Sequence, residues 1–174
     1  MIPRGAPYIG WSDLAAAIGY CLAPGDRASA TAALETSWAP NTVAFLSVRS
    51  GLDALLTLLA LPAGSEIIVT AITIPHIVEI LAHHRLVAVP VDVDPTTLEA
   101  DATEVRRAVT PLTKAILVAH LFGSRMPLDE IAAAARDHHL LLLEDCAQVS
   151  DGSSYRGHAA SARGATREPR HRGG

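Results

Sequence analysis

The stretch from Leu140 to Gln148 constrains the fold more than any other part of the sequence, because four apolar residues run directly into two carboxylates. A short unbroken apolar run is typical of a parallel strand that is covered on both faces. In open α/β sheets, ligands bind just beyond the carboxyl ends of the strands. The sequence therefore predicts a buried strand over 140–144, with Glu144 and Asp145 at a functional edge of a parallel sheet.

Segments with strand and helix patterns alternate along most of the chain. We expect strands over 42–48, 66–70, 86–91, 114–119 and 140–144. We expect helices over 11–19, 51–61, 75–84, from 101 to the proline at 111, and over 127–139. Strands that alternate with helices imply right-handed βαβ crossovers. The predicted fold class is therefore α/β, with a mainly parallel sheet flanked by helices.

The composition is that of a globular domain with a core of its own. The chain has 174 residues, of which 49% are hydrophobic and 18% charged. No apolar run reaches the roughly 18 residues that a membrane span needs, and the first residues lack the apolar core of a signal peptide. Two cysteines do not make a disulfide framework or a zinc site. We therefore expect a cytoplasmic protein without a membrane partner.

Residues 156–174 differ from the rest of the chain. They contain five arginines and one glutamate, and none of the large apolar residues. The sequence predicts a disordered basic tail that contributes no strand and no core. Arginines without interleaved aromatic residues attract phosphate nonspecifically at most, so a nucleic-acid partner is not expected. No G-x-G-x-x-G follows a predicted strand, which disfavours a nicotinamide-binding domain.

Two places could hold an anionic cofactor that carries a ring nitrogen. Ser50 and Gly51 stand at a predicted helix start, where free backbone N–H groups bind phosphate and glycine permits close approach. An ordinary N-cap at Ser50 explains the same residues, and the local sequence favours it. Asp145 at a strand end could pair with a protonated ring nitrogen, as in pyridoxal-phosphate enzymes. A helix cap or a surface ion pair is the alternative for this carboxylate.

The remaining polar candidates are weaker. His120 lies in a strand-end loop and could line the site, although a lone histidine is more often structural. The pairs 83–84 and 138–139 are histidines at helix ends, where the helix dipole favours them. Asp92 and Asp94 alternate at a strand end, but no third ligand accompanies them. We therefore expect no metal site.

Several stretches of the chain together resemble a known family. They stand in one order: Ser50–Leu55, Gly64–Val69, Pro90–Pro95, Thr110–Ile116, Val118–Gly123, Glu144–Gln148 and Tyr155–Gly157. This set resembles the DegT/DnrJ/StrS family of sugar aminotransferases, which are fold-type-I pyridoxal-phosphate enzymes. The resemblance runs from about residue 2 to about residue 161. It implies a lead-in segment over 1–41, part of a fold-type-I large domain that binds pyridoxal 5'-phosphate over 42–155, and the tail over 156–174.

The resemblance also implies roles for individual residues. Asp145 matches the aspartate that pairs with the pyridinium nitrogen, and Gln148 matches the residue that hydrogen-bonds the 3-hydroxyl of the cofactor. Ser50, Gly51 and Leu52 match the turn whose backbone N–H groups bind the phosphate. The family usually has threonine in place of Leu52, so a hydroxyl contact is lost here.

A second departure concerns the face of the cofactor ring. The family commonly has an aromatic residue where this chain has Ile74, and that aromatic residue stacks on the ring. His76 is two residues away and is the candidate to replace it. The local sequence leaves open whether His76 does so.

The third departure is the Schiff-base lysine, which the family places a couple of dozen residues after the aspartate. Residues 159–172 contain no lysine, so no catalytic residue can be assigned. Lys114 is the sole lysine of the chain, and we expect it at the end of its strand opposite Asp145. The tail composition suggests a reading frame lost near Ser161; a genuine basic tail is the alternative.

A complete relative would move an amino group from a donor, commonly glutamate, to a keto sugar, commonly linked to a nucleotide. The family is usually homodimeric. We therefore expect a truncated and inactive form of such an aminotransferase. The alternative is a non-catalytic protein on the same scaffold that binds a partner or a cofactor.

Overall fold

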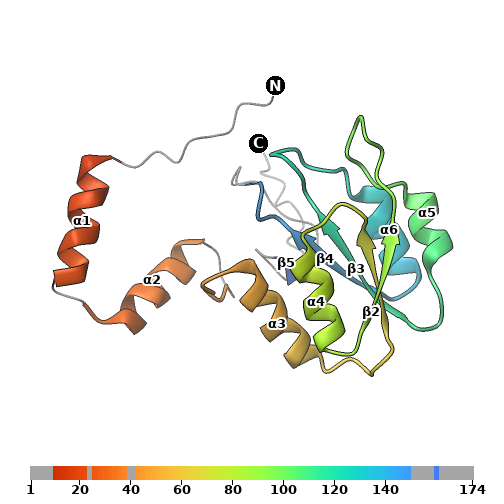
Figure 1. Ribbon diagram of the computed structural model, residues 1–174, viewed down its shortest axis with the longest axis horizontal. Coiled ribbons are helices and arrows are strands. Elements are labelled where there is room, and N and C mark those ends of the chain that lie inside the picture. The colour runs from red at the N-terminus through yellow and green to blue at the C-terminus, as the bar shows by residue number, and fades with distance from the viewer. Residues whose placement is uncertain (1–9, 23–24, 39–41, 150–158, 161–174) are drawn as a thin grey trace, which may run out of the picture. The chain divides into compact units, whose positions relative to one another are not determined.

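The computed structural model describes residues 10–22, 25–38, 42–149 and the strand pair 159–160 (Figure 1). The chain divides into two compact units, Met1–Ala44 and Phe45–Gly174. Within the part of the chain that is described, no helix combines the length and apolar composition needed to cross a membrane.

The first unit contains the helices α1 (Trp11–Leu22) and α2 (Arg27–Trp38). The helix predicted over 11–19 is confirmed and continues to Leu22, whereas α2 was not predicted. No side chain of α1 is buried, and Trp11 is 87% exposed.

Each helix has an aspartate at its N-terminus, Asp13 in the first turn of α1 and Asp26 directly before α2, that accepts hydrogen bonds from backbone N–H groups. Asp13 accepts one at the start of α1, at 2.8 Å. Asp26 accepts hydrogen bonds from the hydroxyl of Ser29 at 2.6 Å and from two backbone N–H groups. These bonds, led by that of Ser29, hold the pKa of the Asp26 carboxyl below its ordinary value. Such contacts satisfy N–H groups that have no partner within a helix.

The second unit is built on one parallel sheet (Figure 1). Its strands are β1 (Glu66–Thr70), β2 (Val87–Val91), β3 (Thr113–Ala119), β4 (Leu141–Asp145) and β5 (Ala159–Ala160), in the order β2-β1-β3-β4-β5. Its helices are α3 (Val48–Leu59), α4 (Pro75–His83), α5 (Ala102–Ala108) and α6 (Asp129–Asp137). Every strand pair is parallel. The α/β prediction is confirmed, and four predicted strands agree with β1 to β4 within one residue at each end.

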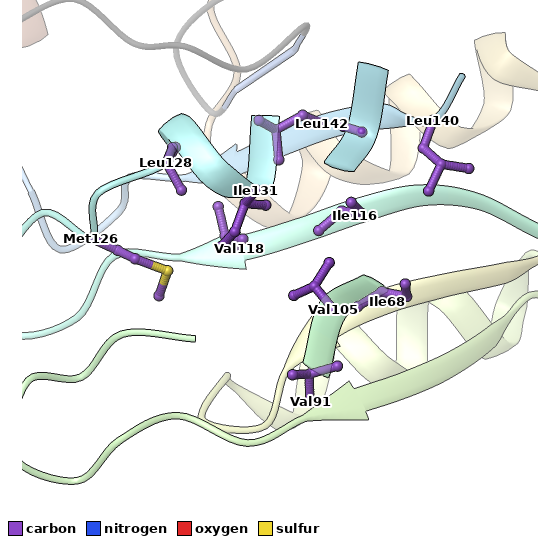
Figure 2. Close-up of a cluster of buried hydrophobic side chains, with 11 residues drawn as sticks. Ile68, Val91, Val105, Ile116, Val118, Met126, Leu128, Ile131, Leu140 and Leu142 are labelled. Atoms are coloured by element: carbon purple, nitrogen blue, oxygen red, sulfur yellow. The ribbon is translucent and has the colours of Figure 1, made fainter. Parts of the chain in front are cut away.

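The apolar strands bury both faces, because successive side chains point to opposite sides. On one face, strand residues such as Ile116 and Leu142 pack with Val105 of α5 and Ile131 of α6, as Figure 2 shows. The opposite face is the α3/α4 face. It holds Ile67, Val69, Ala115, Leu117 and Leu143 against Leu52, Leu56, Ile77 and Leu81 of α3 and α4. The predicted helices on both faces are therefore confirmed.

The strand predicted over 42–48 is wrong. Residues 42–47 form no regular structure, and α3 begins at Val48. The cause is a capping box, in which the Ser47 hydroxyl accepts the backbone N–H of Ser50 and the Ser50 side chain returns the contact. Ser47 is thus the N-cap, and Ser50 lies inside the first turn of the helix that was predicted over 51–61. Leu46 is fully exposed, which a buried strand would not allow.

The prediction that residues 156–174 contribute no strand is wrong at two positions. Ala159 and Ala160 form β5, which pairs in parallel with Leu143 and Glu144 of β4. Pairing uses backbone groups, so a sheet edge can accept residues without large side chains. The rest of the predicted tail lies outside the described residues.

Candidate functional site

The carboxyl ends of β1, β3 and β4 lie together at one end of the sheet, here called the carboxyl edge, because the strands are parallel. The one shift in register between β1 and β3, at Thr113–Ala115, is at the opposite end. Asp145 is the last residue of β4 and lies opposite Ala119, the last residue of β3. Since side chains alternate, Asp145 is on the same side as Leu143, which belongs to the α3/α4 face. Glu144 is on the side of Leu142, against α5 and α6. The two carboxylates predicted at this edge therefore point in opposite directions.

The Asp145 side chain is oriented by a tight turn. Its Oδ1 atom accepts the backbone N–H of Ala147 at 3.0 Å. Its backbone carbonyl accepts the N–H of His120 at 3.0 Å. Among the described residues, no hydrogen bond or ion pair occupies Oδ2. The surface ion pair that was one alternative for Asp145 is not seen among the described residues. The turn uses Oδ1 and leaves Oδ2 available to a ligand.

Gln148 follows three residues later, with a fixed amide. Its Oε1 atom accepts the backbone N–H of Phe122 at 2.9 Å. The amide nitrogen is then the end that can donate to a ligand oxygen. Phe122 has a φ of 53°, in the left-handed region that non-glycine residues rarely adopt. Backbone strain of this kind occurs where surrounding contacts hold the residue in place.

His120 and Glu144 form a buried pair beneath the same edge. Each is 2% exposed, and the Nε2 atom of His120 lies 3.1 Å from Oε2 of Glu144. The other ring nitrogen, Nδ1, accepts the backbone N–H of Met126 at 3.2 Å. Since Nδ1 is an acceptor, the proton of the neutral ring is on Nε2 and is donated to Glu144. His120 is thus a core residue and does not line the surface of the edge.

Cys146 brings a third metal-ligating atom near this pair. The ligand atoms of His120, Glu144 and Cys146 all lie within 4.8 Å of one another. A metal ion would need a lone pair on a ring nitrogen, and both nitrogens of His120 already have partners. The geometry therefore fits a hydrogen-bonded pair better than a metal site.

The predicted phosphate turn lies in the first turns of α3. This helix ends close to the start of β1, so its N-terminus is at the carboxyl edge of the sheet. Leu52 is buried on the α3/α4 face, which is also the side of Asp145. However, the N–H groups of Ser50 and Gly51 are bonded to the Ser47 hydroxyl and carbonyl. The ring of Phe45 lies next to Gly51, and a Cβ atom added at position 51 would be 3.3 Å from the Cδ2 atom of that ring.

The loop after β1 brings further residues to this edge. His76 is exposed in the first turn of α4, and Ile74 before it is 42% exposed. The hydroxyl of Thr73 is buried and has no hydrogen-bond partner among the described residues. A buried hydroxyl without a partner costs free energy unless a ligand or water satisfies it. Convergence of Asp145, Gln148, the Ser50–Leu52 turn and His76 around one cofactor remains a prediction.

The sole lysine lies elsewhere, as predicted. Lys114 is the second residue of β3, five positions before Ala119, so it is about 17 Å from the Asp145 edge along the strand. It lies against the α5/α6 side of the sheet, because the cavity that it lines also contains Leu140 of that core and Val109, which packs against it. Its Nζ atom donates to the Pro111 carbonyl at 3.3 Å. It lines a cavity of about 530 Å³ together with Val109, Thr110, Pro111, Thr113, His138, His139 and Leu140.

Comparison with known proteins gives a consistent result. The chain is 45% identical over 94 residues to an L-glutamine:2-deoxy-scyllo-inosose aminotransferase of Micromonospora echinospora, covering 54% of this chain and 22% of that protein. It is 34% identical over 124 residues to GDP-perosamine synthase of Caulobacter vibrioides, covering 71% and 33%. An aminotransferase structure from Psychrobacter cryohalolentis superposes with a TM-score of 0.75 at 27% identity, covering 85% and 40%.

The chain thus spans less than half the length of the proteins it matches. Residues 30–167 match the family described as DegT/DnrJ/EryC1/StrS aminotransferases. This range includes the sheet, all four helices that cover it, and both Asp145 and Gln148. The chain belongs to the DegT/DnrJ/EryC1/StrS aminotransferase family.

Proposed function

We propose that this chain provides the ring-binding part of a pyridoxal-phosphate site in an aminotransferase that acts on a keto sugar. We further propose that these 174 residues alone do not transfer an amino group. Enzymes of this family use pyridoxal phosphate. The names of two similar proteins, an inosose aminotransferase and a perosamine synthase, support a cyclic polyhydroxylated ketone as the amino acceptor. The amino donor and a homodimeric assembly are carried over from the family in the same way.

The residues at the carboxyl edge fit the ring of this cofactor. The Oδ2 atom of Asp145 would hold a proton on the ring nitrogen, and a charge-assisted bond of this kind is strong when sheltered. The amide nitrogen of Gln148 would donate to the 3-hydroxyl oxygen, since its oxygen is held by Phe122. When bound, pyridoxal phosphate supplies an electron sink for reactions at the substrate carbon.

Two further features of the edge support the proposal. The hydroxyl of Thr73 is a buried polar group that a bound ligand would satisfy. The phosphate would lie at the N-terminus of α3, where the helix dipole favours an anion. For Ser50 and Gly51 to bind it directly, their N–H groups would have to leave Ser47.

The position of Lys114 is the observation that carries the second part of the proposal. Amino transfer requires an amine near the ring, both to attach the cofactor and to move a proton. Lys114 is about 17 Å from the required edge and on the other side of the sheet. It therefore cannot serve a ring held by Asp145.

The test is a binding titration followed by chemical trapping. The purified chain is titrated with pyridoxal phosphate. Asp145→Asn is expected to raise the Kd about tenfold or more, which corresponds to a loss of about 1.4 kcal/mol of binding free energy. Asp92→Asn is the matched control, because Asp92 is exposed just after β2. Reduction with borohydride and peptide mapping should show no specific label at Lys114. Specific labelling there, with amino transfer lost in Lys114→Ala, would refute the proposal.

The distance of Lys114 from Asp145 also favours a second function. The chain would then be a non-catalytic protein on this scaffold that binds a cofactor or a partner. Co-expression with the C-terminal part of a family enzyme that carries the lysine distinguishes the two. Restored amino transfer that depends on Asp145 indicates part of an enzyme. Binding of pyridoxal phosphate without any transfer indicates the non-catalytic function.

A further inference from the structure

We propose that His120 is a positioning residue: its buried ring fastens the loop 120–126 to the end of β4 and thereby fixes Asp145 and Gln148 toward the cofactor ring. This inference rests on the proposed function for what the edge binds. The fastening itself is a property of the protein alone.

His120 makes three hydrogen bonds to three different places. Its backbone N–H donates to the Asp145 carbonyl at 3.0 Å. Its ring Nε2–H donates to Glu144 Oε2 at 3.1 Å, and its Nδ1 atom accepts the N–H of Met126 at 3.2 Å. The ring thus joins Met126, at the far end of the 120–126 loop, to Glu144 of β4, while the backbone N–H holds the near end of the loop to Asp145. At 2% exposure these bonds are shielded from water, which strengthens them.

The loop that His120 closes contains the group that orients Gln148. Phe122 donates its backbone N–H to the amide oxygen of Gln148, and it does so with a φ of 53°. The Ser124 N–H donates to the Leu121 carbonyl at 2.9 Å and tightens the same turn. A left-handed aromatic residue needs such contacts to stay in place. Without the His120 closure, the loop would relax and the Gln148 amide would lose its fixed direction.

The hydrogen bonds of the His120 ring require one particular tautomer. A proton on Nδ1 would face the N–H of Met126, so two donors would oppose each other. A proton on Nε2 satisfies both contacts at once. The sheet enforces the arrangement, because His120 and Glu144 follow Val118 and Leu142 on the α5/α6 side. Asp145 is thus free to face the other side, where α3 and α4 begin.

The first test measures the ring in the unaltered chain. Nitrogen-15 NMR of the labelled protein should show His120 as the neutral Nε2–H tautomer. An Nδ1–H tautomer in the folded chain would overturn the inference. The variant Glu144→Gln keeps an acceptor oxygen for the ring and should keep this tautomer.

The second test separates positioning from general stability. His120→Asn can keep an acceptor near the Nδ1 position but loses the donor to Glu144, and His120→Leu loses both. We expect amide exchange at Phe122 and Met126 to become about 10-fold faster or more in His120→Leu, with a smaller change in His120→Asn. Ile131→Val in α6 is the control for mild core destabilisation. It should not speed exchange at the Phe122 and Met126 amides more than at the amides around them. Unchanged exchange at Phe122 in both folded histidine variants would overturn the inference.

The third test reads the effect on the ligand. Pyridoxal phosphate should bind His120→Asn about 10-fold more weakly than the unaltered chain, whereas Ile131→Val and Glu144→Gln should bind it nearly as well. Equal affinity in His120→Asn, together with fast Phe122 exchange, would refute the positioning role. If the unaltered chain does not bind pyridoxal phosphate, the proposed function fails, and the tautomer and exchange measurements still decide the His120 fastening.

Discussion

Replacing Leu52 by threonine, the residue that the family usually has there, should cost stability in this chain. Leu52 is 8% exposed and packs with Leu56, Ile67 and Leu143 in the core under α3 and α4. Threonine has two carbons fewer, and at about 0.8 kcal/mol for each buried carbon group the loss is about 1.6 kcal/mol. A residual cavity adds to this, so we expect a total of about 2–3 kcal/mol.

The new hydroxyl need not add a further penalty. Position 52 lies inside α3, four residues after Val48, and a threonine in a helix can donate to the carbonyl four residues earlier. Thr57 in the same helix does this with the Asp53 carbonyl at 2.9 Å. The cost should therefore come from lost packing and not from an unsatisfied hydroxyl.

Urea unfolding followed by circular dichroism measures this cost. Leu52→Thr should lower the midpoint with little change in the slope, as expected for a change in stability alone. Leu58→Thr is the matched control, because Leu58 lies in the same helix and is 84% exposed; it should shift stability by no more than about 0.5 kcal/mol. A Leu52→Thr chain as stable as the original, or an equal loss in Leu58→Thr, would refute the reasoning.

Three further predictions concern a helix cap, an ion pair and the site. Asp101→Ala should cost about 1 kcal/mol in thermal unfolding, because the Asp101 carboxylate caps α5 by accepting a backbone N–H at 2.7 Å. Hydrogen bonding from Arg106 holds the pKa of Asp137 below its ordinary value. The contribution of this ion pair to folding stability is therefore present above about pH 4 and is lost as the pH falls further. In Arg106→Gln, an NMR titration should show the Asp137 carboxyl titrating at higher pH, and an unchanged titration would contradict the assignment. Gln148→Glu keeps an acceptor for Phe122 but loses the donor, so pyridoxal phosphate should bind more weakly while the melting temperature changes little.

The sheet was predictable because each strand is a short apolar run between turn signals. The predicted strand 66–70 matches β1 residue for residue, and 140–144 is displaced from β4 by one residue. The stretch 42–48 failed because its apolar residues also fit a loop, and the Ser47–Ser50 capping box decides where the helix begins. This spacing of two serines was the available signal.

The site was only partly predictable. Asp145 and Lys114 could be placed at opposite ends of neighbouring strands, because a parallel sheet fixes the direction of both. The pairing of His120 with Glu144 joins residues 24 positions apart, and no local pattern reports a contact of that kind. The two-residue strand β5 likewise depends on the edge offered by β4 and not on its own side chains.

The two consecutive carboxylates at the end of β4 connect the buried His120–Glu144 pair with the candidate site residue Asp145. Because strand side chains alternate, Glu144 must enter the side of α5 and α6 if Asp145 is to face α3 and α4. A buried carboxylate is costly without a donor, and His120, directly after the neighbouring strand β3, supplies one on the same side of the sheet. The same histidine then holds the backbone of Asp145 and the loop that orients Gln148. The buried pair on one side of the sheet therefore helps to hold in place, on the other side, the carboxylate that we propose binds the cofactor ring.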